Sequence, residues 1–96
     1  MRVISPKMLY EFWSLHPDAR GPLTNWRRIA AKAEWKLFDD LKASFRTADR
    51  YKQFVIFDIG GNKYRLIAAI HYNTGRVYIR HVLTHAEYTR GRWKKV

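Results

Sequence analysis

The stretch "KYRLIAAIHYNTGRVYIRHVL", residues 63–83, decides the fold, because it holds two apolar strands and the loop that joins them. Residues 63–71 and 76–83 are rich in β-branched and aromatic side chains, which favour strands. The loop "YNTG", residues 72–75, ends in Gly75, which is suited to the left-handed conformation that closes a hairpin. The stretch therefore predicts an antiparallel β-hairpin.

Further strands are predicted on the N-terminal side of this hairpin. "KQFVIFDI", residues 52–59, alternates like a strand, and "GGN", residues 60–62, is a turn signal. "RVIS", residues 2–5, is apolar enough for an edge strand, although it is short. "RTADRYK", residues 46–52, is interpreted as a loop.

The first predicted helix begins at "SP", with Ser5 as N-cap and Pro6 as the first helical residue. It ends near His16, because the residue before Pro17 is disfavoured in a helix. Its apolar stripe, at spacings of three and four, consists of Met8, Leu9, Phe12, Trp13 and His16.

A second predicted helix is capped by Asp18 and has Pro22 in its first turn, where a missing amide is tolerated. Its buried stripe consists of Leu23, Trp26, Ile29, Ala30 and Ala33, and its outer side carries Arg27, Arg28, Lys32 and Lys36. "FDDLKASF", residues 38–45, predicts a short helix capped by Asp39 or Asp40. "THAE", residues 84–87, fits a capping box of Thr84 and Glu87 and predicts a short C-terminal helix.

This order of elements predicts one α+β domain over residues 1–96, with two N-terminal helices packed on one face of a twisted antiparallel sheet. A hydrophobic content of 47% is enough for a core and argues against a disordered basic tail. The absence of cysteine excludes disulfides and cysteine-based zinc sites. No apolar run approaches the ~20 residues of a membrane span, so a soluble protein is expected. The lack of cysteine suits a reducing cytosol, so a cytoplasmic location is expected.

The chain is strongly basic, with 19 Lys and Arg against 8 Asp and Glu and a net charge of +11. Such an imbalance indicates an anionic partner. Nucleic acid is the first candidate, and an acidic protein or a membrane surface comes next.

The hairpin register predicts which side chains share a face. With the loop at residues 72–75, His71 pairs with Arg76, Ile67 with Arg80, and Arg65 with Val82. The open face then holds Lys63, Arg65, Arg76 and Arg80, whereas His81 and Leu83 lie on the face that receives the helices. A one-residue bulge would turn one strand over relative to the other.

Two arginines on an open face suit a phosphate, and His85 and Tyr88 of the C-terminal helix would stand at its rim. RNA cleavage through the 2′-hydroxyl needs such groups and no metal. Arg65 and Arg80 would stabilise charge, His85 would transfer a proton, Tyr88 would transfer a proton or hold the nucleotide, and Lys63 would contact the phosphate.

The alternatives are a solvated basic face, a loop-capping His85 and a core-packing Tyr88. His81 and His85 form only a weak metal pattern, because no third ligand is evident.

Three motifs, "GGNKYRL", "VYIR" and "THAEY", resemble in order and spacing the HigB family of toxins within the RelE-like superfamily. "MRVIS", "HPDA" and "DLKASF" extend the resemblance over nearly the whole chain. It implies a type II toxin that cleaves mRNA, usually on the translating ribosome, without metal or organic cofactor. It also implies a HigA-like helix-turn-helix antitoxin, through which the complex binds operator DNA. The cleft residues it implies are Lys63, Arg65, Arg80, His85 and Tyr88.

The predicted RNA-binding and ribosome-binding surface comprises Arg27, Arg28, Lys32, Lys36, Arg76, Arg90, Arg92, Trp93 and Lys94. Trp93 would stack on a base or pack on the body of the protein. Two other functions use the same surface, namely a non-catalytic nucleic-acid-binding module and an inactive antitoxin-binding partner.

Overall fold

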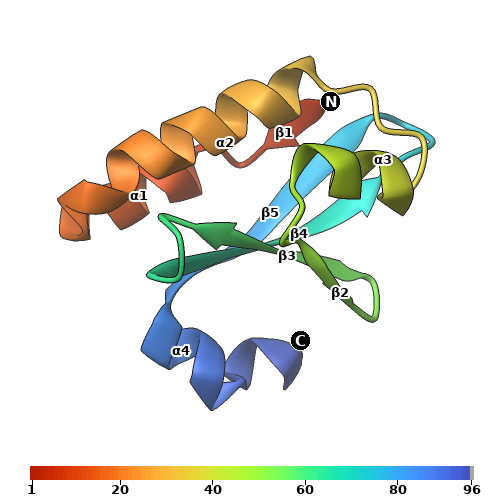
Figure 1. Cartoon of the computed structure of the whole chain (residues 1–96). Helices are drawn as coiled ribbons and strands as arrows, with labels where there is room; N and C mark the ends of the chain where they lie inside the picture. Colours follow the sequence, from red (N-terminus) through yellow and green to blue (C-terminus); the bar gives the residue numbers. More distant parts are fainter. Residues whose placement is uncertain (96) are drawn as a thin grey trace.

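A computed structural model describes residues 1–95 (Figure 1). The strands are β1 (Arg2–Ile4), β2 (Asp49–Tyr51), β3 (Phe54–Ile59), β4 (Tyr64–His71) and β5 (Arg76–Thr84). The helices are α1 (Lys7–Leu15), α2 (Arg20–Lys32), α3 (Phe38–Ser44) and α4 (His85–Arg90), with 3₁₀ turns η1 (Pro17–Ala19) and η2 (Arg92–Lys95). The strands form one sheet in the order β1-β5-β4-β3-β2.

The α+β prediction is confirmed, but the sheet is mixed and not wholly antiparallel. β1 pairs in parallel with β5, whereas the other neighbours are antiparallel. Residues 49–51, predicted as loop, form β2 on the edge of β3. Three residues carry too little pattern to predict a strand; β2 forms because β3 offers an unpaired edge.

The predicted N-caps of the first three helices are wrong. Ser5 has a positive φ of 67° and Pro6 occupies the cap position of α1. Asp18 lies in η1 and does not cap α2, and Leu37 is the N-cap of α3. Two of these aspartates accept from other donors: Asp18 from the Tyr64 hydroxyl, and Asp40 from the Lys36 amide at 2.8 Å. The capping box at Thr84 is confirmed, as is the end of α1 before Pro17.

The main core lies between the sheet and helices α1, α2 and α3. Leu9, Leu23, Leu41 and Leu66 are fully buried there. Trp26 meets Phe57 edge-on with ring centroids 5.4 Å apart. The predicted stripe of α2 is confirmed at its centre.

A second, smaller apolar cluster occupies the other face of the sheet. Phe54, Ile56, Ile67 and Ala69 pack there against Trp93. Figure 1 shows α4 and the chain end on the opposite side of the sheet from the three other helices. We call residues 85–95 the tail, and the face it covers the tail face.

A bulge interrupts the β4–β5 ladder and changes the predicted faces. Near the loop the pairing is as predicted, with His71 opposite Arg76. The register shifts between Ile67 and Ala68, so Ile67 pairs with His81 and not with Arg80. Arg65 correspondingly pairs with Leu83 instead of Val82. Val82 therefore packs against the helices, whereas His81 and Leu83 face the tail.

Candidate functional site

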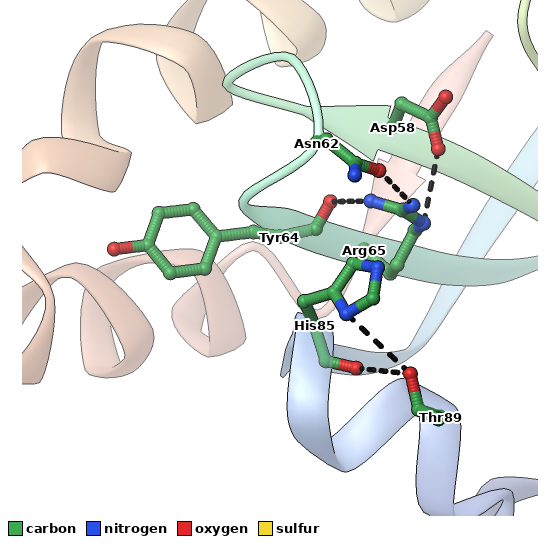
Figure 2. A network of polar contacts seen from close by, with 6 residues as sticks. All are labelled: Asp58, Asn62, Tyr64, Arg65, His85 and Thr89. Carbon is green, nitrogen blue, oxygen red and sulfur yellow. Dashed lines mark hydrogen bonds and ion pairs between the residues drawn. The ribbon is translucent and has the colours of Figure 1, made fainter.

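Arg65 lies on the tail face, as predicted, but it is buried, with a relative exposure of 8%. Its Nε forms an ion pair with Asp58 Oδ1 at 3.0 Å, and its terminal nitrogens donate to the Tyr64 carbonyl and to Asn62 Oδ1. Figure 2 shows these contacts around the guanidinium. Tyr88 covers the group, with the guanidinium carbon 5.2 Å from its ring centroid. The charge of Arg65 is thus engaged within the protein.

α4 begins beside the turn that precedes β4. The Thr84 hydroxyl accepts from the Glu87 amide, and the Glu87 carboxylate accepts from the Thr84 amide. The His85 amide donates to the Lys63 carbonyl at 3.0 Å. The His85 ring is exposed, and its Nδ1 lies 3.4 Å from the Thr89 hydroxyl (Figure 2). The ring is therefore accessible to a ligand at the tail's edge.

The tail is fastened to the sheet by two aromatic residues. Tyr88 and Trp93 stack with ring centroids 5.5 Å apart and planes 10° apart. Trp93 Nε1 donates to the Tyr88 carbonyl at 3.1 Å, and the indole is 3% exposed. Of the two predicted uses of Trp93, packing on the body is the one observed. Tyr88 likewise packs against the second cluster.

Lys63 does not share the tail face with Arg65, so this part of the prediction is wrong. Its Nζ lies 3.3 Å from Asp18 Oδ2 in η1. The Tyr64 hydroxyl donates to the other oxygen of Asp18. This hydrogen bond, followed by Lys63, holds the pKa of Asp18 below its ordinary value, while Asp18 raises the pKa of Tyr64. Lys63 and Asp18 thus join the β3–β4 turn to η1.

Arg80 differs from Arg65 in being exposed. Neither ion pair found within residues 1–95 involves it. It borders a hollow of about 640 Å³, which we call the hairpin hollow. The other residues around this hollow are Gln53, Phe54, Ala69, Ile70, His71, Tyr72, Asn73 and His81. A free guanidinium beside a partly aromatic hollow can receive a phosphate and an attached base.

His81 is a candidate that the sequence prediction missed. It borders both the hairpin hollow and a second hollow of about 240 Å³ beside the tail, lined also by Glu87, Arg90 and Trp93. Burial, assisted by the charge of Arg80, lowers the pKa of its imidazole below 6.5. The regular hairpin register predicts His81 among the helices, and no glycine or proline in β5 marks the bulge that changes this register. The only available signal was that Val82 suits a core better than His81 does.

The predicted catalytic residues therefore fall into separate groups. Arg65, Tyr88 and His85 lie around the start of α4 and the β3–β4 turn. Arg80 borders the hairpin hollow, whose lining includes none of those three. The expected pair of free arginines is not present, because Asp58 neutralises one of them.

Comparison with known proteins shows which family the chain resembles. Residues 19–91 match the model of the HigB toxin family, described as the RelE-like toxic component of a toxin-antitoxin system. The chain belongs to the HigB toxin family. It is 32% identical over 91 residues to the mRNA interferase toxin HigB of Escherichia coli K12, covering 92% of this chain and 88% of that protein. The mRNA interferase HigB of Shigella flexneri matches with the same identity and coverage, and that of Escherichia coli CFT073 is 26% identical over 93 residues.

The predicted RNA-binding residues of this HigB-family chain lie mostly on its surface. Arg27 donates to the Tyr10 hydroxyl and Arg28 to Asn25, so both are held on the outer side of α2. The remaining cations of the set, all exposed, are Lys32, Lys36, Arg76, Arg90, Arg92 and Lys94. Residues 1–95 contain no cluster of three potential metal ligands, and no helix among them is long and apolar enough to cross a membrane.

Proposed function

We propose that this chain is an endoribonuclease toxin of a type II toxin–antitoxin system that cleaves mRNA on the translating ribosome. The observation that carries the proposal is Arg80, an exposed guanidinium beside a hollow large enough for a nucleotide. Membership of a toxin family, and the name of its relatives as mRNA interferases, support the same reaction.

The proposed chemistry is attack of a ribose 2′-hydroxyl on the adjacent phosphorus. The 2′-oxygen forms a bond to phosphorus, the bond to the 5′-oxygen breaks, and a 2′,3′-cyclic phosphate remains. Arg80 stabilises the negative charge that grows on the phosphoryl oxygens, a contribution of about 10²–10³-fold in rate for one well-placed donor. No metal or organic cofactor is required, because the RNA supplies the nucleophile.

The other predicted residues retain proposed roles that match their surroundings. His85, exposed at the tail's edge, contacts the RNA outside the two hollows. Arg65 acts by positioning, since its guanidinium holds the ring of Tyr88 and thereby one side of the tail. Tyr88 supports the tail through its stack on Trp93. Lys63, paired with Asp18, acts through the β3–β4 turn, where its carbonyl accepts from the His85 amide.

The positive charge of the chain indicates which partners it binds. The cations along α2 and the tail bind ribosomal RNA, whose phosphates offer the matching charge. The cognate antitoxin is a HigA-like helix-turn-helix protein, which brings the complex to operator DNA. Both proteins would act in the cytoplasm.

The deciding experiment compares Arg80→Ala with Arg2→Ala, an exposed arginine on the neighbouring strand β1 that belongs to no predicted site. Each variant is induced in cells, and primer extension maps cuts in a translated message. We expect Arg80→Ala to lose at least about 100-fold in cleavage and to stop arresting growth, with folding retained. Arg2→Ala should keep most activity. Equal cleavage by Arg80→Ala and the native protein would refute this assignment.

A non-catalytic RNA-binding module is the second candidate function, favoured by the neutralisation of Arg65. It predicts salt-sensitive binding to ribosomes without any cut in the message. The native protein in the same primer-extension experiment separates the two candidates. Repeating the cleavage reaction with purified components in excess chelator tests the metal independence of the proposed reaction.

A further inference from the structure

We propose that His81 is the general base that removes the proton from the attacking 2′-hydroxyl. The inference rests on the proposed function and names the residue that begins the reaction. Three features carry it: the side of the sheet on which His81 lies, its position between two hollows, and the cations around it.

The bulge is the feature that brings His81 to Arg80. Consecutive residues of a regular strand point to opposite faces. In β5 the ladder skips Arg80, because Ala68 pairs with Ile79 and Ile67 with His81. Both Arg80 and His81 then border the hairpin hollow. A phosphate held by Arg80 would place the neighbouring ribose within reach of the imidazole.

The two hollows define a path for the RNA. Trp93 and the end of the tail border the smaller hollow, and His81 borders both hollows. Arg90 and Arg92 line the smaller hollow and would bind phosphates on that side. A single strand that passes from one hollow to the other must therefore pass the imidazole. The exposed His85, in contrast, borders neither hollow.

The surroundings of His81 keep its ring neutral, as a proton acceptor requires. Arg80 is adjacent on β5, and Arg90 and Arg92 face it from the tail. His71 borders the same hairpin hollow from β4. The carboxylate that approaches from the tail, Glu87, already accepts from the Thr84 amide. Burial and Arg80 lower the pKa of His81, so the neutral form predominates at neutral pH.

The proposed step conserves atoms and charge. The 2′-O–H bond breaks, and its proton moves to the imidazole while the 2′-oxygen bonds to phosphorus. The bond between phosphorus and the 5′-oxygen breaks, and the 5′-oxygen takes a proton from water. The resulting hydroxide is neutralised by the proton on His81, which restores the neutral ring. No oxidant, metal or further reactant takes part.

The test uses ribosomes programmed with a short mRNA and measures single-turnover cleavage by His81→Asn. The control is His16→Asn, a half-buried histidine that stacks on Phe12 and borders neither hollow. We expect His81→Asn to lose about 10²–10⁴-fold in rate, the usual contribution of a general base, and His16→Asn to lose little. Binding of an mRNA with a 2′-deoxy nucleotide at the cleavage site should be the same for both variants and the native protein.

A pH profile separates proton transfer from a structural role. The native rate should rise through the lowered pKa of His81 and level off above it. His81→Asn should lack this acidic limb, and added imidazole should partly restore cleavage by His81→Ala.

The outcomes distinguish the two proposals. If the native protein cleaves, Arg80→Ala does not, and His81→Asn keeps the native rate and pH profile, the role of His81 is refuted and the proposed function stands. If the native protein cuts no message, both are refuted.

Discussion

Arg65 and Arg80 belong to neighbouring strands of one sheet and border the tail face, yet their surroundings are opposite. Arg65 is 8% exposed and bonded to Asp58, Asn62 and a carbonyl. Arg80 is exposed beside the hairpin hollow. The same side chain thus stabilises the fold in one region and remains available to a ligand in the other.

The neighbouring strands explain this difference. Asp58 stands directly opposite Arg65 in the β3–β4 ladder, so a carboxylate is supplied by the register itself. On the outer side of β5, the pairing with β1 ends at Tyr78. Beyond that point β5 is an edge strand, where bulges are common and can re-aim side chains. Arg80 lies in this segment, whose outer edge no strand covers.

Substitution of each arginine by methionine should give the largest difference in stability between the two regions. Arg65→Met should lower the free energy of unfolding by on the order of 3 kcal/mol, because Asp58 would remain partly buried without its partner. Arg80→Met should change it by less than about 0.5 kcal/mol, as expected at an exposed site. Urea denaturation measures both values. Similar losses in the two variants would show that Arg80 also has a structural role.

The sequence predicted the elements around the site better than the surfaces they present. The helices, the β4–β5 loop and the capping box at Thr84 follow from local patterns, because apolar periodicity and turn signals depend on residues close in sequence. The N-caps of the first three helices do not follow from such patterns.

The bulge depends on the register between β5 and β4 and on the point where the pairing of β1 with β5 ends. Both involve segments that are distant in sequence. The bulge reversed the predicted faces of His81 and Val82. The burial of Arg65 could not be predicted from local sequence either, because its partner Asp58 lies on the neighbouring strand β3.

Substitution of Trp93 tests whether this indole holds the tail against the sheet, between Arg65 and Arg80. Trp93→Ala should lower the free energy of unfolding by about 2 kcal/mol, less than the ~3–5 kcal/mol of an interior Trp, because the terminal turn can leave the sheet as a unit. Hydrogen exchange should accelerate in α4 and spare α1. Trp13→Ala, on α1, is the matched control and should affect the helix face instead. Unchanged exchange in α4 would show that Tyr88 alone fastens the tail.

Acidification should produce the smallest effect and distinguishes His81 from Asp18. The folded pKa of His81 lies below 6.5, so the unfolded chain binds more protons and stability falls as the pH drops through 6.5 towards the folded value. The folded pKa of Asp18 lies below 3.8, so its contribution to stability is present above pH 3.8 and is lost only in stronger acid.

Urea midpoints of the native protein and of His81→Asn, measured between about pH 7 and pH 5, isolate the effect of His81. The native midpoint should fall more steeply than that of His81→Asn, while Asp18→Asn should keep the native slope. Parallel slopes for all three proteins would mean that His81 is solvated, and the Arg80 region would then lack the neutral base that distinguishes it from the Arg65 region.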